Sequence, residues 1–230
     1  MASQRVPAFR GFIATAGTPG RLLDIGCGFG FFVRLAAAAG WNATGVDVDP
    51  TAVAYARTRL GIAAFVGDAC QLPVADASFD LITIWNVLEM VGDPLSLLRE
   101  AARLVRPSGR IFIRTPNERF HLASFRLAHA LDGRRRRPCQ TPAFATFVFH
   151  ATSFSRRTLP IALARTGLEL ESIHNSPPIS GDPYLGSRRA RALLIGGIKH
   201  VVHAVAQVAA FATGERWLLG PSLEAWARRR

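Results

Sequence analysis

Short apolar runs alternate with segments of helical character through the first half of the chain. The apolar runs are residues 22–25, 43–48, 63–66, 79–85 and 110–115, and the helical segments are 31–39, 50–59 and 93–105. Gly40 follows the first helical segment, Pro50 opens the second, and Asp93 with Pro94 opens the third, all residues suited to those positions. Continuous apolar strands separated by helices are typical of a parallel sheet covered by helices. The pattern therefore predicts an α/β protein.

Regularity is lost at Pro116 and resumes at Ser155. Ser155 is suited to cap a helix ending at Gly167, and residues 168–174 then alternate like a strand. A segment rich in Pro and Gly, 175–186, leads to a very apolar helix over 188–213. We expect an insertion over about 116–152, irregular or helical, and a last strand at about 222–227.

The apolar helix over 188–213 carries one narrow polar stripe. Lys199, His203 and Gln207 recur every four positions, with His200 beside them. A Lys, two His, a Gln and two adjacent Gly near the middle of this segment disfavour a transmembrane span. The pattern predicts an amphipathic lid or interfacial helix.

The N-terminus and the cysteines bear on location. Residues 1–16 contain no uninterrupted apolar stretch of the length of a secretory signal, and we expect a short leader with one or two helical turns around residues 8–16. Cys27, Cys70 and Cys139 are odd in number and far apart, which suggests reduced thiols rather than disulfides or a metal site. We expect a cytoplasmic protein without bound metal.

Positive charge is concentrated in the second half of the chain. Residues 1–118 hold 11 Arg and 10 acidic residues, for a net charge of +1, whereas residues 119–230 hold 17 Arg or Lys and 6 acidic residues, for +11. Such a surface suits anionic lipid, RNA or an acidic substrate. A solvated surface is the alternative, favoured by the fact that Lys199 is the only Lys among the 28 basic residues.

A glycine-rich loop follows the first apolar run, in the sequence LLDIGCGFGFF at 22–32. A dinucleotide fingerprint beginning at Gly26 needs glycine at position 31, where this chain has Phe31. A Walker loop needs Gly-Lys-Ser or Gly-Lys-Thr, and the chain has neither. The loop therefore suits a ligand that carries less negative charge than a pyrophosphate.

Three acidic residues stand at or near the ends of the first three predicted strands. Asp24 comes just before the glycines, Asp47 ends the second strand, and Asp68 follows the third. The carboxyl ends of the strands are where ligands bind in an open α/β sheet, and an acid after the second strand there suits ribose hydroxyls. Asp68 is placed to accept from an adenine amine and Asp24 to face an ammonium group. Three carboxylates without a phosphate anchor suit a cationic nucleoside such as S-adenosylmethionine.

Several motifs in order resemble the class I S-adenosylmethionine-dependent methyltransferases, in particular the small-molecule branch that includes ubiquinone and menaquinone biosynthesis enzymes. The resemblance rests on LLDIGCGFG (22–30), GVDVDPTAVAYAR (45–57), GDACQLPVADASFDLITIWNVLEMV (67–91), DPLSLLREAARLVRPSGRIFIRTPN (93–117) and FSRRTLPIALARTGLELESI (154–173). It covers about residues 20–175. The resemblance implies one domain over 1–230 with a Rossmann-like, doubly wound, seven-stranded and mostly parallel sheet.

The resemblance also assigns residues to the cofactor. It places a loop around the methionine part, contacts to the ribose and adenine, and contacts beside the methyl group, with S-adenosyl-L-homocysteine as the product. The implied residues are Asp24, Gly26, Cys27, Gly28 and Gly30 in the loop, Asp47 and Val48 at the ribose and adenine, Asp68 and Ala69 at the adenine edge, and Trp85 and Asn86 beside the methionine part and the methyl group. Structural alternatives are a helix cap for Asp47, a turn for Asp68 and a core position for Trp85.

Catalytic groups are less defined. The family often has His where this chain has Met90, so no role tied to that His is carried over. A general base is needed only when the acceptor must lose a proton. His121, His129 and His150 are the candidates. The resemblance puts His150 first, because the family's substrate-facing insertion re-enters the sheet there, just before the helix opened by Ser155. A histidine bonded to loop backbone is the alternative for His150.

The acceptor is the open question. Grouped aromatic residues at 144–154 and the apolar helix favour a hydrophobic small molecule, such as a quinone precursor, a lipid or a natural product, methylated on oxygen. The basic second half suits an anionic membrane surface as a partner. An RNA methyltransferase and a non-catalytic cofactor-binding protein remain alternatives, and the sequence does not indicate an oligomeric state.

Overall fold

A computed structural model describes residues 2–132, 152–177 and 189–230. Seven strands form one sheet in the order β3-β2-β1-β4-β5-β7-β6. Their bounds are β1 Arg21–Ile25, β2 Asn42–Asp47, β3 Ala63–Val66, β4 Phe79–Trp85, β5 Val105–Pro116, β6 Leu168–Asn175 and β7 Ser222–Arg229. β7 pairs antiparallel with both β5 and β6, and the remaining pairs are parallel. The predicted seven-stranded, mostly parallel sheet with an antiparallel last strand is confirmed.

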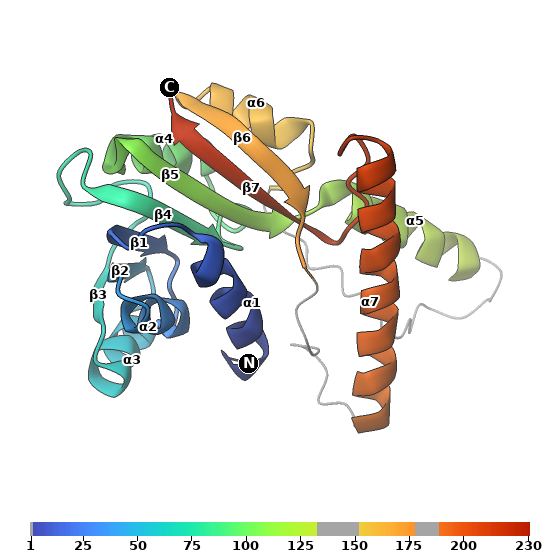
Figure 1. Cartoon of the computed structure of the whole chain (residues 1–230), viewed down its shortest axis with the longest axis horizontal. Coiled ribbons are helices and arrows are strands. Elements are labelled where there is room, and N and C mark those ends of the chain that lie inside the picture. Colours follow the sequence, from blue (N-terminus) through green and yellow to red (C-terminus); the bar gives the residue numbers. More distant parts are fainter. Residues whose placement is uncertain (1, 133–151, 178–188) are drawn as a thin grey trace.

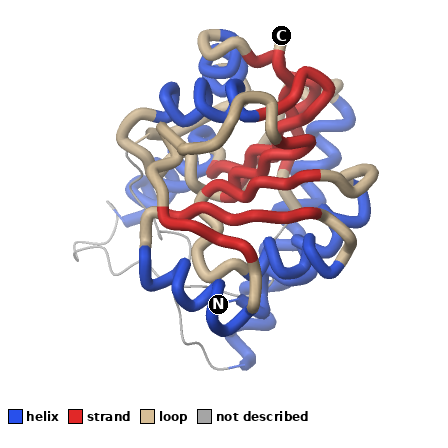
Figure 2. Tube along the Cα trace, turned by 90° about the vertical axis from the view of Figure 1, so that its left-hand side faces the viewer, coloured by secondary structure: helices blue, strands red, loops and turns tan. Residues whose placement is uncertain are grey.

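Helices lie around this sheet, whose strands occupy the middle of the molecule (Figures 1 and 2). Their bounds are α1 Ala2–Thr15, α2 Phe31–Ala38, α3 Pro50–Leu60, α4 Pro94–Leu104, α5 Glu118–Asp132, α6 Thr158–Ala164 and α7 Arg189–Ala212. The predicted cap at Asp93 forms, accepting from the Leu95 and Ser96 N–H groups ahead of α4, and Asp49, which the sequence analysis did not assign, accepts from the Thr51 N–H ahead of α3. Each carboxylate therefore satisfies backbone donors that a helix leaves unpaired.

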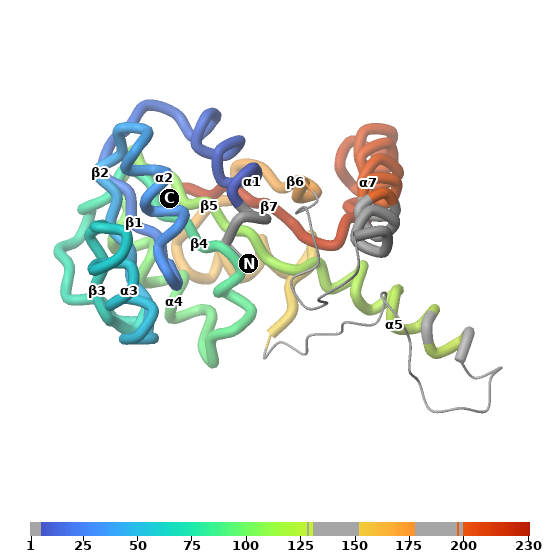
Figure 3. Tube along the Cα trace, turned by 90° about the horizontal axis from the view of Figure 1, so that it is seen from below, coloured from blue at the N-terminus to red at the C-terminus, as the bar shows by residue number. Residues whose placement is uncertain are grey.

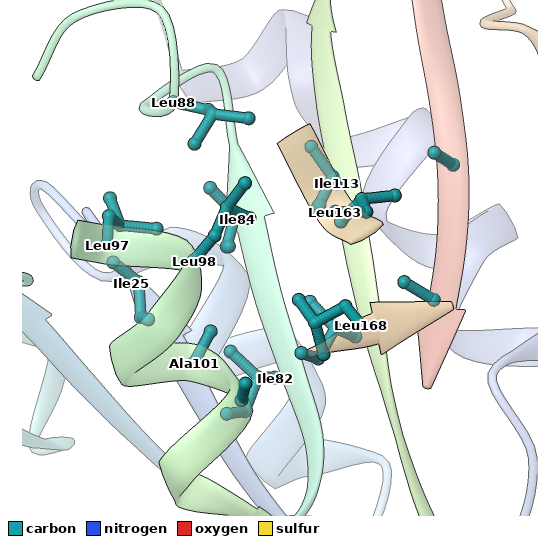
Figure 4. Close-up of a cluster of buried hydrophobic side chains, with 14 of the residues drawn as sticks. Ile25, Ile82, Ile84, Leu88, Leu97, Leu98, Ala101, Ile113, Leu163 and Leu168 are labelled. Carbon is teal, nitrogen blue, oxygen red and sulfur yellow. The ribbon is translucent and has the colours of Figure 1, made fainter. Parts of the chain in front are cut away.

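Apolar side chains fill both faces of the sheet. On one face, α4 and α6 pack against the central strands, and Ile82, Ile84, Leu97 and Leu98 are fully buried (Figure 4). The other face has a cluster from α1, α2 and the strands, in which Phe112 is 1% exposed. Burial on both faces explains why the strand sequences are continuously apolar rather than alternating.

The strand order reverses between β1 and β4. The connections after β1 and β2 run through α2 and α3 to one side of β1, whereas β4 pairs with the other side of β1. Ligands of open α/β sheets bind beyond the carboxyl ends of the strands at this point of reversal. The fold therefore places the glycine loop, which follows β1, at the expected binding edge.

Two helices lie in segments where the sequence pattern left the structure less defined. The expected short leader is the 14-residue helix α1, whose Phe9 is 7% exposed in the second cluster. Residues 118–132, in the insertion expected to be irregular or helical, form helix α5, and Asn117 accepts from the Arg119 N–H at its start. Helix α1 is held by tertiary contacts of its apolar side chains with the second cluster, whereas Leu122, Phe125 and Leu127 of α5 are exposed.

Helix α7 occupies nearly the range over which an apolar helix was expected. The Asn175 amide on β6 donates to the Ala206 carbonyl oxygen of α7 at 3.0 Å, and Ala206 is buried. Among the described residues, no helix is both long enough and apolar enough to span a membrane.

Candidate functional site

The glycine loop connects β1 to α2 and is tied to β2 by backbone hydrogen bonds. Gly26 and Cys27 both donate their N–H groups to the Val46 carbonyl oxygen, at 2.8 and 3.0 Å. Gly30 donates to the Cys27 carbonyl oxygen at 2.9 Å and leads directly into α2. The loop is therefore a defined turn with its backbone held against the carboxyl end of β2.

Two of the glycines have distinct reasons to lack a side chain. A Cβ on Gly26 would lie 2.2 Å from Cγ2 of Val87, so this position allows the segment after β4 to approach the loop. At Gly28 the backbone φ is +51°, and a Cβ would meet nothing within 4 Å. The space in front of Gly28 is thus open, as a loop that receives a ligand against its backbone requires.

Asp24 is a buried carboxyl group beneath this loop. It is 3% exposed and accepts a hydrogen bond from the Thr83 hydroxyl of β4 at 2.7 Å. Burial raises the pKa of Asp24 to about 7, against the lowering effect of the Thr83 hydrogen bond and with a further rise from the nearby Asp47 charge. A cation placed beside it would stabilise the charged form and lower that pKa.

Asp47 ends β2 and faces the loop. Its Oδ2 accepts from the Gly28 N–H at 2.7 Å, and its Oδ1 accepts from the Asp49 N–H at 2.9 Å. The carboxylate is half-buried, and each oxygen keeps a second lone pair for a further donor. The helix-cap alternative for Asp47 does not apply, because Asp49 caps α3.

Asp68 and Ala69 lie in the connection after β3. The Asp68 side chain is exposed and its Oδ1 accepts from the Cys70 N–H at 2.9 Å, which forms a turn of the kind that Asp favours. Ala69 is 8% exposed and belongs to the main apolar cluster. Asp68 therefore forms the turn of the alternative interpretation and also presents an exposed carboxylate. Ala69 lies in the core.

Exposed apolar side chains border the loop. Val48, directly after β2, is 68% exposed. Phe29, within the glycine loop, is 50% exposed, and its ring packs nearly perpendicular to the Tyr55 ring with the centroids 5.3 Å apart. Flat ligands such as an aromatic base bind against surfaces of this kind. Sequence reasoning did not assign Phe29, and an aromatic residue between two glycines was the available signal.

Trp85 ends β4 within the aromatic cluster beneath α1. Its ring lies 5.0 Å from Phe9 and 4.7 Å from Phe112, and it is 8% exposed. Its Nε1 is buried and has no hydrogen-bond partner among the described residues. The structure thus places Trp85 in the core, as the alternative interpretation had it.

Asn86 follows Trp85 in a left-handed backbone conformation, with φ of +58°. Its Oδ1 accepts a hydrogen bond from the Arg114 guanidinium of β5. Arg114 is 7% exposed, and its Nε donates to the Ser176 hydroxyl at 2.8 Å and lies 3.9 Å from Glu224. This network orients Asn86 so that its amide nitrogen can donate to a ligand.

Sequence reasoning missed Arg114 and Glu224. The two residues lie on neighbouring strands, β5 and β7, that are paired at Arg114 and Glu224 but far apart in the chain. Burial raises the pKa of the Glu224 carboxyl, and the Ser176 hydrogen bond and the Arg114 charge oppose that rise. A charged residue inside the otherwise apolar β5 run was the available signal.

Two of the three candidate bases, His121 and His129, lie within the described residues. The His121 Nε2 lies 3.0 Å from the Pro221 carbonyl oxygen, and His129 is exposed near the end of α5. His150 lies outside the described residues. Met90 is 67% exposed, and its neighbour Glu89 is buried and accepts from the Thr115 hydroxyl at 3.1 Å.

The arrangement fits S-adenosylmethionine. The open space at Gly28 admits a ligand to the loop backbone, and Asp24 and Asp47 are close enough for the charge of one to raise the pKa of the other. The loop lacks the Gly-Lys-Ser or Gly-Lys-Thr of a Walker loop, and Phe31 stands where a dinucleotide fingerprint has its third glycine. The site therefore suits a cationic nucleoside better than a dinucleotide.

Comparison with known proteins agrees with this geometry. The family described as methyltransferase domain matches residues 2–173. A probable S-adenosylmethionine-dependent methyltransferase of Mycobacterium tuberculosis is 36% identical over 97 residues, which are 42% of this chain and 35% of that protein. A ubiquinone biosynthesis O-methyltransferase of Aromatoleum aromaticum is 37% identical over 106 residues, which are 44% of this chain and 45% of that protein. The chain thus matches less than half of the length of these relatives.

A solved structure shows the same fold over nearly the whole chain. Geranyl diphosphate C-methyltransferase of Streptomyces coelicolor, in complex with Mg²⁺, geranyl diphosphate and S-adenosyl-L-homocysteine, superposes with a TM-score of 0.65. The superposition covers 98% of this chain and 81% of that one, at 16% identity.

Proposed function

The chain belongs to the family of S-adenosylmethionine-dependent methyltransferases, and from this premise we propose that it transfers a methyl group to an oxygen of a hydrophobic small molecule. The proposed binding of S-adenosylmethionine rests on the open glycine loop with Asp24 and Asp47 beside it. The oxygen is supported by the similarity to the ubiquinone biosynthesis O-methyltransferase.

Four side chains are suited to bind S-adenosylmethionine. Asp47 is suited to bind the ribose hydroxyls with the lone pairs left after its two backbone hydrogen bonds. Asp24 is suited to face the ammonium group, and Val48 and Phe29 to border the adenine. When bound, the cofactor supplies a methyl group on a positively charged sulfur.

The protein's own contribution to the reaction is orientation. An in-line displacement on an already good leaving group gains most from holding the acceptor oxygen, methyl and sulfur in one line. Asn86, fixed by Arg114 at the carboxyl end of β4, is a rigid positioning group for this purpose. An acceptor hydroxyl must also lose a proton, and His150 is our proposed base.

Calorimetric titration with S-adenosyl-L-homocysteine tests the cofactor site. We expect Asp47→Ala to weaken binding by at least about tenfold, since it removes a charged hydrogen-bond acceptor and leaves the Gly28 N–H without that acceptor. Glu169→Ala is the matched control, because Glu169 is an exposed acid on β6 with only a surface ion pair to Arg228. Equal binding by both variants, or no binding by the unmodified protein, would contradict the proposed site.

Transfer of labelled methyl groups into fractionated cell extract tests the acceptor. We expect label in small apolar compounds extracted into organic solvent. Label in RNA would instead support the alternative that the basic second half binds nucleic acid. Binding of cofactor without any transfer would favour a non-catalytic protein.

A hydrophobic acceptor bears on where the protein works. Molecules of this kind partition into lipid, so a position at a membrane surface belongs to the same proposal. The net charge of +11 over residues 119–230 supports an anionic surface.

A further inference from the structure

Helix α7 stands apart from the helices that cover the sheet. Figure 1 shows it at the end of the molecule toward which β5 and β6 point, and Figure 3 shows α5 and α7 projecting at that same end. One side of α7 is anchored: Ala206 and Ala210 are buried, and the Asn175 amide holds the Ala206 carbonyl oxygen. The helix therefore has an inner face toward β6 and an outer face.

The outer face of α7 is apolar and exposed. Residues at 201, 205, 208 and 211 recur at helical spacing and fall within about 120° of the helix circumference, opposite to positions 206 and 210. Their exposed fractions are 64% for Val201, 60% for Val205, 68% for Val208 and 91% for Phe211. We call these four side chains the outer stripe.

Two further exposed apolar residues follow the outer stripe beyond the end of the helix. Trp217 is 60% exposed and Leu219 is 44% exposed in the segment that leads to β7. A helix that is apolar on two opposite sides is typical of one buried on both, whereas the described structure covers only one side of α7. A contiguous exposed patch of large apolar side chains marks an interaction surface.

The distribution of charge indicates which kind of partner binds this surface. Residues 119–230, which include both projecting helices, carry a net charge of +11, and Arg119, Arg126 and Arg216 are exposed beside the apolar positions of α5 and α7. A second copy would bring an equally positive surface against it, which like-charge repulsion opposes. An anionic lipid surface offers both the opposite charge and an apolar layer.

We propose that the outer stripe of α7 docks the protein on an anionic lipid bilayer, with the helix lying in the plane of the interface. Val208 and Phe211 enter the boundary between headgroups and acyl chains, and Trp217 sits at the headgroup level where indole rings are enriched. The exposed arginines bind lipid phosphates. This docking brings the carboxyl edge of the sheet, where Asp24, Asp47 and Asn86 lie, toward the bilayer.

The inference deepens the proposed function and rests on it in one respect only, which is that the acceptor is apolar. Docking would let an acceptor pass from the bilayer to the site without crossing water. The docking itself is a physical property of α7 and is measured without any methyl transfer.

Flotation with vesicles tests the docking. We expect the full chain to float with vesicles of phosphatidylcholine containing phosphatidylglycerol, to float weakly with phosphatidylcholine alone, and to detach as salt screens the charges. The variant Val208→Ser/Phe211→Ser should lose binding to the anionic vesicles by more than about tenfold, because two apolar side chains no longer enter the lipid.

Ile161→Ser is the matched control, because Ile161 is 59% exposed on α6, away from α7. It should float like the unmodified protein, and circular dichroism should show unchanged helix content in both variants. Failure of the unmodified protein to float, or equal flotation of all three proteins, would overturn the inference. So would a dimer in sedimentation velocity that Val208→Ser/Phe211→Ser converts to monomer, since a second copy would then cover the stripe.

Failure of this inference and failure of the proposed function are separable. Loss of flotation with intact labelling of apolar compounds from detergent extract contradicts the docking alone. Flotation that depends on the stripe, together with label in RNA or in no fraction, supports the docking and contradicts the proposed acceptor.

Discussion

At the scale of single residues, the site depends on how buried and bonded each carboxyl group is. Asp24, Asp47 and Asp68 look equivalent in the sequence, yet Asp24 is buried against Thr83, Asp47 is tied to two backbone donors, and Asp68 is exposed in a turn. A carboxyl group without nearby positive charge keeps its proton more readily when buried. The three acids therefore have different surroundings, and burial raises the pKa of Asp24.

Asp24→Asn should change the pH dependence of stability. The pKa of Asp24 is about 7 in the folded protein against 3.8 for the ordinary group, so between these values the folded state binds a proton that the unfolded state has released. The unfolding free energy contributed by Asp24 therefore falls as pH rises from 3.8 to about 7 and is constant above that. Urea unfolding across this range should show a less negative slope with pH for Asp24→Asn.

Proton release gives an independent measurement of the same group. An ammonium beside Asp24 lowers its pKa, so binding of S-adenosyl-L-homocysteine near neutral pH should release a proton from the unmodified protein and not from Asp24→Asn. Titrations in buffers of different ionisation heat measure this. Glu169→Gln, at an exposed ion pair, should behave like the unmodified protein. An equal release by Asp24→Asn would contradict an ammonium at this position.

At the scale of elements, helix α1 completes one face of the core. Phe9 and Phe12 bring their rings to between 4.4 and 5.7 Å of rings on α2, β4, β5 and β7. This packing contributes to the burial of Trp85, which is 8% exposed. Sequence patterning expected only one or two turns here, because the helix is formed by packing more than by its own periodicity.

Phe9→Ala should destabilise the protein by about 3 kcal/mol, since it removes a buried ring and leaves a cavity between α1 and the sheet. Urea unfolding monitored by circular dichroism gives the difference. Leu127→Ala, at a position 62% exposed on α5, should change the stability by less than about 0.5 kcal/mol. Similar losses for the two variants would mean that α1 is not part of the folded core in solution.

At the scale of the whole molecule, one sheet joins the two halves of the chain. β7, close to the C-terminus, lies between β5 and β6 and is paired with both. The basic second half therefore shares its core with the cofactor half, although the two differ in net charge by 10 units, from +1 to +11. We expect a single domain.

Calorimetric heating should accordingly show one transition whose measured enthalpy equals its van't Hoff enthalpy. S-adenosyl-L-homocysteine should raise the midpoint of that one transition, because it binds the folded state only. Two resolved transitions, with only one shifted by the ligand, would show instead that the second half unfolds as a separate unit.

The sequence by itself determined the elements that local pattern encodes. Apolar runs located β1 to β5 to within a few residues, except that β5 begins earlier, at Val105, and alternation located β6. The caps at Asp49 and Asp93 form as residue type dictates. Gly26, Gly28 and Gly30, with acids at neighbouring strand ends, predict a ligand site at one edge of the sheet, because parallel strands bring their carboxyl ends to one edge.

Only the tertiary structure decided what depends on distant neighbours. It buried Trp85 under α1, paired Arg114 with Asn86 and Glu224, and selected a helix, α5, within an insertion expected to be irregular or helical. It also decided which side of α7 is covered, since Ala206 and Phe211 are both apolar in sequence and only one is buried. Burial is a property of the assembled chain, because each face of an element is covered or left open by segments far away in sequence.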